Sequence, residues 1–387
     1  MKILHTGDWH IGKLVHGYHM TEDQDYALNS ICDVIKEEKP DVLVIAGDIY
    51  DRSNPPVEAV ALLNKYLNKI LMELETPIIA IAGNHDSADR LHFGSDIFSK
   101  NGLYIEGVFR KDIKRIVLKD EHGPVNFYLL PFVEPAIVRE VFNVDVRNYE
   151  DATKIILDYI KENMNKEERN VLVAHGYVTG INEPETCESE RALSIGGTDY
   201  IKAEIFEEFH YTALGHLHKC QKVSDDRIRY SGSLLKYSFS ECNHKKSVTV
   251  VTLDEKGEVE VSLRPVKTLR DMRKIKGNLE NLLDMEVYND TNVEDYIHAI
   301  LTDEGELLEP MRKLKSIYPN IMSLERENRI NNLGDIKTSA GEGAKYKSKM
   351  ELFEEFYVSI TGKEFTEEKK EIMSSIIEEL QKEERSN

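Results

Sequence analysis

The sequence predicts an α/β fold in which two β-sheets form a sandwich flanked by helices. Short apolar runs that are typical of buried strands alternate with longer amphipathic stretches through about the first 180 residues. Later in the chain, residues 247–266 alternate apolar and polar side chains around Lys256-Gly257, which is the pattern of a hairpin of two half-buried strands. Polar residues and glycines follow the apolar runs, as they do where the strands of an open sheet end.

The strands of the predicted sheets are runs of β-branched and aliphatic residues. These runs are MKILHT (1–6), DVLVIAG (41–47), TPIIAIAG (76–83), NVLVAHG (170–176), FHYTALGHLHK (209–219) and RIRYSGS (227–233). Because each run is short and most are apolar throughout, we expect strands that are covered on both faces.

Helices are expected between these strands. The first should cover residues 21–38, because Thr21 and Gln24 fit a capping box and Lys39-Pro40 ends the periodic pattern. The second should begin at the prolines of residues 55–56 and continue to about residue 74. A third helical pattern, DATKIILDYIKENM, covers residues 151–164.

The composition divides the chain into four units. We expect a catalytic domain over 1–267, a small α+β capping domain over 268–332, a linker rich in Gly, Ser and Lys over 333–348, and a C-terminal helix pair over 349–387. The helix pair has an apolar stripe on each helix. Two short helices behind a linker cannot bury such stripes by themselves, so we expect a partner surface rather than helices folded back on their own domain.

Composition and charge limit the class of protein. No run approaches the ~20 apolar residues of a membrane span, and the first residues lack the apolar core of a signal peptide. The four cysteines show no CxxC spacing, so a reduced, cytoplasmic protein is expected. With a formal net charge of −20, any binding to nucleic acid must depend on local basic patches, bound cations or a partner.

Side chains that can bind metals stand where the strands end. They occur in Gly7-Asp8-Trp9-His10, Gly47-Asp48, Gly83-Asn84-His85-Asp86, His175-Gly176 and Gly215-His216-Leu217-His218. The candidate ligands are Asp8, His10, Asp48, Asn84, His175, His216 and His218. This mixture of nitrogen and oxygen donors suits Mn, Fe or Zn better than Mg or Ca.

Seven ligands are too many for one tetrahedral ion. They suit two ions ~3.5–4 Å apart that share a carboxylate, which is the arrangement of many phosphoryl-transfer sites. The Asp-x-His and His-x-His spacings would place both members of each pair on one face of an extended strand. The other histidines are expected to be structural, and Trp9, between two ligands, is expected in the core.

This ordered series resembles the calcineurin-like metallophosphoesterase superfamily, whose signature is D-x-H, G-D-x-x-D, G-N-H-[DE], H and G-H-x-H. The resemblance implies one ion held by Asp8, His10 and His218, and a second held by Asn84, His175 and His216. It also implies that Asp48 bridges the two ions. His85 would steady the phosphoryl transition state or protonate the leaving oxygen, and Asp51 would orient His85.

Further stretches resemble the bacterial SbcD family of nuclease subunits. They are ILHTGDWHIGK (3–13), SIGGTDYI (194–201), YSGSLLKYSFSE (230–241) and the C-terminal helix pair. The resemblance implies DNA as substrate, two Mn²⁺ ions (with Mg²⁺, Fe and Zn as alternatives) and an SMC-type ATPase partner of the SbcC type. ATP would be bound by that partner and not by this chain, for which no cofactor-binding residue is expected. A homodimer is expected, with residues 21–38 and 56–74 as possible interface helices.

Two alternatives to a nuclease stay open. Asp51-Arg52 resembles the pair of Ser/Thr phosphoprotein phosphatases, in which the arginine grips phosphate, so a phosphoprotein or nucleotide phosphatase is the first. Arg52 could equally be a surface residue before the helix. A non-catalytic scaffold of the same fold is the second, although such scaffolds lack several ligands and this chain retains them all.

The candidates for contacts with DNA are basic and aromatic residues that follow the motifs in the sequence. We expect substrate contacts from Arg52, Arg90, Lys236 and Tyr237, and consider Lys13, His16, Tyr18 and Lys219 as well. Any of these could instead be an ordinary loop residue.

Overall fold

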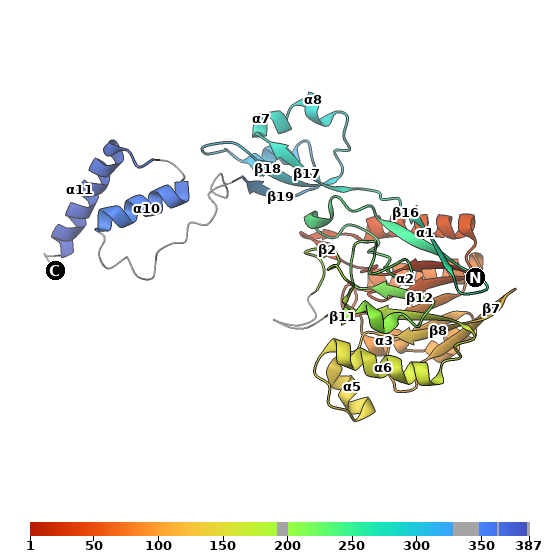
Figure 1. Cartoon of the computed structure of the whole chain (residues 1–387). Coiled ribbons are helices and arrows are strands. Elements are labelled where there is room, and N and C mark those ends of the chain that lie inside the picture. Colours follow the sequence, from red (N-terminus) through yellow and green to blue (C-terminus); the bar gives the residue numbers. More distant parts are fainter. Residues whose placement is uncertain (192–199, 328–347, 362–363, 385–387) are drawn as a thin grey trace.

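The computed structural model describes residues 1–191, 200–327, 348–361 and 364–384. Two six-stranded sheets lie face to face in the catalytic domain, which occupies one side of Figure 1. The first sheet has the order β16-β15-β1-β4-β5-β6. Its strands are β1 (Lys2–Thr6), β4 (Val42–Ile45), β5 (Ile78–Ile81), β6 (Leu103–Glu106), β15 (Ser247–Leu253) and β16 (Val259–Pro265).

The second sheet has the order β13-β14-β12-β9-β8-β7. Its strands are β7 (Arg115–Asp120), β8 (Gly123–Leu130), β9 (Arg169–His175), β12 (Tyr211–Gly215), β13 (Gln221–Lys222) and β14 (Ile228–Tyr230). Strands β1, β4, β5 and β6 run parallel, as do β8, β9, β12 and β14. The α/β sandwich expected from the sequence is therefore confirmed, because parallel strands need the helical crossovers that the sequence pattern predicted.

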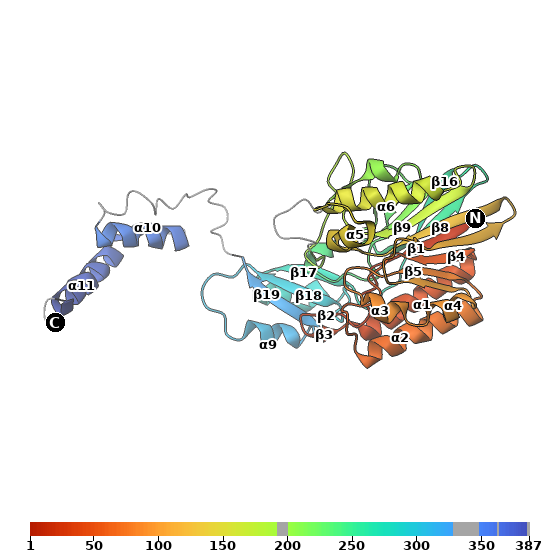
Figure 2. The ribbon, with the colours of Figure 1, turned by 90° about the horizontal axis from the view of Figure 1, so that it is seen from below.

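Helices cover the outer face of each sheet, as Figure 2 shows. On one side lie α1 (Thr21–Glu38), α2 (Val57–Asn68), α3 (Ala88–His92) and α4 (Ser95–Ser99), and on the other α5 (Pro135–Phe142) and α6 (Tyr149–Asn163). The helix α2 continues into a π-helical turn, η1 (Lys69–Glu73). Three apolar clusters fill the layers, and the one between the sheets joins Val44 and Ile79 to Phe127 and Val173.

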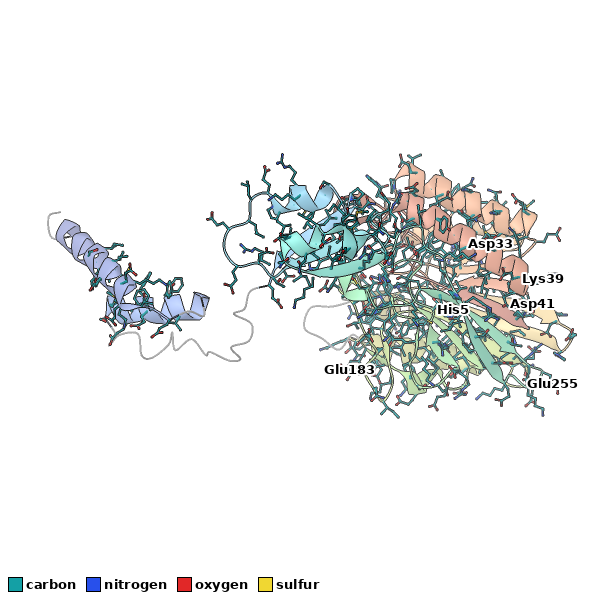
Figure 3. All side chains as sticks on the ribbon, turned by 90° about the horizontal axis from the view of Figure 1, so that it is seen from above. His5, Asp33, Lys39, Asp41, Glu183 and Glu255 are labelled. Atoms are coloured by element: carbon teal, nitrogen blue, oxygen red, sulfur yellow. The ribbon has the colours of Figure 1, made fainter. Side chains whose placement is uncertain are left out.

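His5 spans the space between the two sheets and is labelled in Figure 3. Its Nδ1 lies 2.8 Å from the hydroxyl of Tyr211 and its Nε2 lies 3.2 Å from the carbonyl of Leu214. Burial lowers the pKa of His5 to about 3, so the ring is neutral at ordinary pH. This agrees with a structural role for a histidine that lies outside the motifs.

The beginning of α1 differs from the expected capping box. Met20 stands at the N-cap position without a side-chain hydrogen bond. Gln24 instead points inward, where its Oε1 accepts the N–H of Gly12 at 3.0 Å and its Nε2 donates to the carbonyl of His10 at 2.7 Å. The buried amide is needed to satisfy the loop after β1, and this requirement outweighs the capping preference.

The capping domain is a three-stranded parallel sheet with helices on one face. It contains β17 (Met272–Gly277), β18 (Tyr296–Leu301), β19 (Ile321–Arg326), α7 (Leu279–Leu282), α8 (Met285–Tyr288) and α9 (Pro310–Lys315). Lys236 joins it to the catalytic domain by an ion pair with Asp271 at 2.7 Å. Arg270 adds a second ion pair with Asp23 at 2.8 Å.

The C-terminal helices α10 (Lys349–Thr361) and α11 (Glu367–Glu384) form a pair, as expected. The ring of Phe365 packs between them, 5.7 Å from Phe353 and 5.1 Å from Tyr357 by ring centroids. Nearly all of the predicted linker, and most of the stretch 194–201, lie outside the described residues. Within the described helices, none is both long and apolar enough to cross a membrane.

Short elements that the sequence pattern did not predict complete the fold. They include the hairpin β2 (Leu14–Val15) and β3 (Tyr18–His19), the antiparallel pair β7–β8, the two-stranded sheet of β10 (Val178–Thr179) and β11 (Ile201–Lys202), and the 3₁₀ turns η2 (Ala203–Phe206) and η3 (Phe239–Glu241). The hairpin β2–β3 and the turn η3 lie beside the capping domain.

Candidate metal centre

Five loops that follow strands of both sheets meet at one place. Asp8 and His10 follow β1, Asp48 follows β4, Asn84 follows β5, His175 ends β9, and His216 and His218 follow β12. Apart from the half-buried Asn84, all of these residues are buried. The structure thus brings all seven predicted ligands together, because the carboxyl ends of neighbouring parallel strands share an edge.

The first group of ligands consists of Asp8, His10 and His218, whose donor atoms all lie within 4.8 Å of one another. The Nε2 atoms of His10 and His218 face each other at 3.0 Å. Two imidazole nitrogens that face each other this closely can share at most one hydrogen, whereas a cation between or beside them can be bound by both.

The second group is centred on the side-chain oxygen of Asn84. This Oδ1 lies 2.9 Å from Nε2 of His175 and 3.2 Å from Nδ1 of His216. The Nδ1 of His175 lies 2.9 Å from the carbonyl of Ala46, which can only accept, so Nδ1 carries the hydrogen and Nε2 is left to bind an ion.

Asp48 lies between the two groups. Its Oδ2 is 3.6 Å from Nε2 of His10 and 3.5 Å from Nε2 of His175. One carboxylate therefore reaches the ligands of both groups, as a bridging ligand of two ions must.

The backbone of the ligand loops is unusual. Asp8, His10, Asp48 and His216 all have positive φ, at 50°, 46°, 49° and 111°. β1 has already ended at Thr6, so Asp8 and His10 are not alternate residues of an extended strand, and that part of the sequence argument is wrong. Left-handed conformations cost roughly 1–2 kcal/mol each for residues with a Cβ and are concentrated at functional sites.

Glycines make room for the ligands. A Cβ on Gly83 would collide with the carboxylate and backbone N of Asp48, and one on Gly47 would collide with the ring of His175. The glycines before the ligands are therefore required by close packing of the loops.

The electrostatics of the cluster suit divalent cations. Burial lowers the pKa of His10, His175 and His216, so these imidazoles are neutral and have lone pairs for a metal. Burial and the adjacent charge of Asp48 raise the pKa of Asp8 well above its usual value. Two carboxylates buried side by side need positive charge, and the neutral histidines around them do not supply it. The residues present therefore fit two divalent metal ions.

His85 lies beside this cluster, with its ring centroid 4.7 Å from that of His10. Its Nδ1 lies 2.8 Å from the backbone carbonyl of Asp51, so Nδ1 carries the hydrogen and Nε2 is the atom that can gain or lose a proton. The resemblance implied that the carboxylate of Asp51 orients His85, whereas the structure shows a contact with its backbone carbonyl. The carboxylate of Asp51 binds Nζ of Lys13 at 2.7 Å instead of His85.

Two carboxylates that hold the loops were not predicted. Asp86 accepts hydrogen bonds from the backbone N–H groups of Gly83, Ile49 and Tyr50, and so fixes the loop after β5 against the loop after β4. The resemblance included an acidic residue at this position in its signature, which was the available signal. Glu241, at the end of η3, is the second.

Glu241 orients His218 through Ser189. The Nδ1 of His218 lies 2.7 Å from the hydroxyl of Ser189, and that hydroxyl donates to Oε1 of Glu241 at 2.6 Å. Nδ1 of His218 must then donate, which leaves Nε2 for the metal. Burial alone would raise the pKa of Glu241. The ammonium of Lys246, 2.5 Å away, and the hydrogen bonds that the carboxylate of Glu241 accepts outweigh burial and lower this pKa below its usual value.

We expect Glu241→Gln to weaken metal binding by roughly 10- to 100-fold. The amide is neutral and has only one oxygen, so it cannot both accept the hydroxyl of Ser189 and balance the charge of Lys246. Titration of the purified chain with Mn²⁺ in a calorimeter would measure the change. Glu255→Gln, at an exposed position labelled in Figure 3, is the matched control and should bind like the wild type. Equal affinities for the wild type and Glu241→Gln would contradict this role.

The residues expected to contact substrate are placed less favourably. The ammonium of Lys236 is engaged by Asp271 and by the carbonyl of Cys242, both at 2.7 Å, because it joins the two domains. Tyr237 is buried, and its hydroxyl donates to the carbonyl of Trp9 at 2.5 Å. The hydroxyl of Tyr237 and the ammonium of Lys236 are therefore structural, and neither prediction of a DNA contact is supported.

Other candidates remain on the surface. Arg90 lies on α3 and binds Asn54 at 2.7 Å, away from the ligand groups and beside the apolar face of α2. Arg52 is half exposed, and its guanidinium lies 4.0 Å from the carboxylate of Asp51, whose backbone carbonyl contacts His85. Lys219 is paired with Glu185, and the hydroxyl of Tyr18 contacts the carbonyl of Ile321 in the capping domain. Trp9 is fully buried, as expected.

Comparison with known families gives two matches. Residues 1–220 match the calcineurin-like phosphoesterase family. Residues 268–361 match the SbcD C-terminal family, which is described as the type 5 capsule protein repressor C-terminal domain. The first match contains all seven candidate ligands and His85, and the second contains the capping domain and α10.

Solved structures give distant matches. They include TT1561 of Thermus thermophilus (12% identity, 69% of this chain and 99% of that one, TM-score 0.40). A second is a dimetal phosphatase from Danio rerio, with 12% identity over 69% of this chain and 97% of that one and a TM-score of 0.41. A third is YfcE, a phosphoesterase from E. coli, with 10% identity over 69% of this chain and 100% of that one and a TM-score of 0.26. TM-scores this low add no weight to an assignment.

The matched families and the geometry agree. A calcineurin-like domain that carries an SbcD-type C-terminal domain is characteristic of SbcD-type subunits, and the ligand clusters are those of a metal-dependent phosphoesterase. The chain therefore belongs to the calcineurin-like phosphoesterase family, and within it to the SbcD type.

Proposed function

We propose that this protein is a Mn²⁺-dependent DNA nuclease subunit that hydrolyses phosphodiesters in the cytoplasm during DNA repair and recombination. Its substrates would be double-stranded ends, which it shortens, and hairpins or single strands, which it cuts internally. The observation that carries the proposal is the bridging position of Asp48 between two ligand groups, because two-ion sites are suited to displacement at phosphorus.

The chain's own residues would hold and orient the reacting groups. Asp8, His10 and His218 would hold one cation, and Asn84, His175 and His216 the other, with Asp48 shared. Bound cations would supply Lewis acidity toward the phosphoryl oxygens and a water molecule. Nε2 of His85, fixed through Nδ1 by the carbonyl of Asp51, would stabilise the phosphoryl group or give a proton to the leaving oxygen.

DNA is favoured over a phosphoprotein by what surrounds the site. The SbcD-type C-terminal match covers the capping domain, and a phosphatase gives no reason for that domain or for the helix pair. Because the net charge is −20, DNA would be held by local cations and by bound metal ions rather than by the field of the whole chain.

The helix pair α10–α11 would bind an SbcC-type SMC ATPase. Leu352, Phe356, Ile372 and Ile376 are all at least 40% exposed, although each belongs to an apolar stripe. An exposed stripe on two helices fits the helix-in-groove mode, in which a partner supplies the missing apolar surface. The partner, not this chain, would bind ATP.

A homodimer would use the face formed by α2, η1, α3 and α4. Val57, Met72, Phe93 and Ile97 there are between 69% and 80% exposed. Of the two helices expected at an interface, α2 is favoured by this distribution, because most apolar side chains of α1 are buried.

The test is digestion of end-labelled linear and hairpin DNA by the purified chain, with Mn²⁺ or Mg²⁺, beside a phosphopeptide control. We expect cleavage of DNA in Mn²⁺, loss of cleavage with a chelator, and an intact phosphopeptide. The same reactions with an SbcC-type partner and ATP establish whether that partner gates the activity.

Turnover of the phosphopeptide with intact DNA would overturn the proposal and favour the phosphatase suggested by Asp51-Arg52. Binding of two metal ions with no hydrolysis of any phosphoester, even with the partner and ATP, would favour the scaffold.

A further inference from the structure

A cleft of about 460 Å³ lies between the capping domain and the catalytic domain. One wall is the face of the β17–β18–β19 sheet opposite the helices, where Lys274, His298 and Ser323 stand side by side in register. The other wall comes from the hairpin β2–β3 and from residues 188–189, and the floor is the turn η3. This volume is within the range of pockets that bind a molecule the size of a nucleotide.

Three rings from three separate elements gather in the cleft. Phe239 of η3 is in the middle, with its centroid 5.5 Å from that of His16 and 5.2 Å from that of His298. His16 is at the exposed tip of the β2–β3 hairpin, where His16 and Gly17 both have positive φ, as a two-residue hairpin turn requires. Burial lowers the pKa of His298, so its ring is a neutral stacking surface.

Cations and hydroxyls accompany the rings. Lys13 and Lys274 line the cleft from opposite walls, and Ser238 and Ser323 add hydroxyls. Two carboxylates are also present. Glu325 is engaged by Nε2 of His298 at 3.3 Å, and Glu188 stands at an exposed position. Rings, two lysines and hydroxyls are the chemistry that binds a base and its phosphate without selecting a sequence.

Residues that line the cleft also contact ligands of the metal centre. Ser189 lines it and also holds Nδ1 of His218. The ring of Tyr237 lines it too, and its centroid is 5.6 Å from that of His10. Lys13 is bound to Asp51, whose carbonyl holds His85. A nucleotide in the cleft would therefore be a direct neighbour of a phosphodiester at the metal ions.

We propose that this cleft binds one unpaired nucleotide next to the scissile phosphodiester, with its base against the rings of His16, Phe239 and His298. Lys274 would face its phosphates, and Lys13, which is paired with Asp51, would add positive charge beside them. The inference rests on the proposed nuclease function and adds to it a structural basis for acting on unpaired DNA. A paired base cannot lie against these rings, because it is already stacked within its duplex.

The test uses the full chain, and compares wild type with His298→Ala, His298→Phe, His16→Ala and Lys274→Ala. Each is assayed with a single-stranded oligonucleotide and with bis(p-nitrophenyl) phosphate, which has no nucleobase and no neighbouring phosphate for the cleft to bind. His122→Ala and Lys119→Ala, at exposed positions of β7 and the turn that follows it, are the matched controls.

We expect His298→Ala to raise KM for the oligonucleotide by roughly 5- to 100-fold, which is the range for losing one base–aromatic contact. His16→Ala and Lys274→Ala should act in the same direction. His298→Phe retains a ring and should stay near wild type, and hydrolysis of bis(p-nitrophenyl) phosphate should be unchanged in every variant.

Unchanged KM for the oligonucleotide in the three alanine variants would overturn the inference while leaving the nuclease proposal intact. An equal loss on both substrates would also overturn it, because the substitutions would then have disturbed the metal centre rather than a site for a nucleotide. A wild type that hydrolyses bis(p-nitrophenyl) phosphate but neither cuts nor binds DNA, alone or with the ATPase partner, would overturn both proposals.

Discussion

Asp48→Asn is expected to lower phosphodiester hydrolysis by roughly 10³-fold or more, because it removes the one carboxylate shared by both ligand groups. The amide is neutral and offers only one oxygen, so it cannot balance two divalent charges. The metal content should fall below two ions per chain. The shape of the side chain is kept, and Oδ1 can still accept the backbone N–H of His85, 2.9 Å away in the wild type.

Thermal unfolding separates this effect from misfolding. The charge of Asp48 helps to raise the pKa of the buried Asp8, so the two carboxylates repel each other when no metal is bound. We therefore expect the metal-free variant to be at least as stable as metal-free wild type, but to gain less stability from Mn²⁺. The same substitution at the half-exposed Asp33, labelled in Figure 3, should change neither quantity. Full activity with two bound ions in Asp48→Asn would show that Asp48 does not bridge.

His85→Ala is expected to slow cleavage of DNA by about 10²- to 10⁴-fold while metal binding is kept. His85 contacts the carbonyl of Asp51 and lies beside the ligands without belonging to either group around Asp48. Single-turnover rates on labelled DNA, together with metal content, would measure both quantities.

The dependence on the leaving group tells the two roles of His85 apart. If Nε2 protonates the leaving oxygen, the loss should be large for DNA and small for bis(p-nitrophenyl) phosphate, whose leaving group needs no proton. A similar loss on both substrates would indicate that His85 stabilises the phosphoryl group instead. No loss on either substrate would remove His85 from the mechanism.

The ligand set could be predicted from the sequence because its signal is local. Each ligand follows an apolar run within a few residues, and the rule that parallel strands end at a common edge brings such loops together. That rule needs no knowledge of which strand lies beside which. For this reason His175 and His216 could be counted with Asn84 among the candidate ligands, although they are separated from it by about 90 and about 130 residues along the chain. The division of the ligands between two ions came only from the family resemblance.

What could not be predicted depends on contacts between distant segments. Nothing in the local sequence shows that Asp8 and His10 have left-handed backbones, because their N–H groups are held by carbonyls of the loop after β4. Gln24 has the right spacing for a capping box, but its side-chain amide is hydrogen-bonded to the buried loop at Gly12, 12 residues earlier in the chain. The sequence around Lys236 suggests a contact with phosphate, but in the folded chain its ammonium forms an ion pair with Asp271 of the capping domain. In each case tertiary contacts outweigh a local preference.

The division of the ligands between the two sheets has a consequence for biosynthesis. Each ion would take ligands from both sheets, with His218 completing one group and His175 and His216 completing the other. A growing chain that has reached residue 170 has formed Asp8, His10, Asp48 and Asn84, which are three of the four ligands of the first group and two of the four of the second when Asp48 is counted in both. Neither group is complete until the chain has passed His218 and the two sheets have closed on each other. A nascent phosphoesterase of this design would stay inert until its catalytic domain is nearly finished.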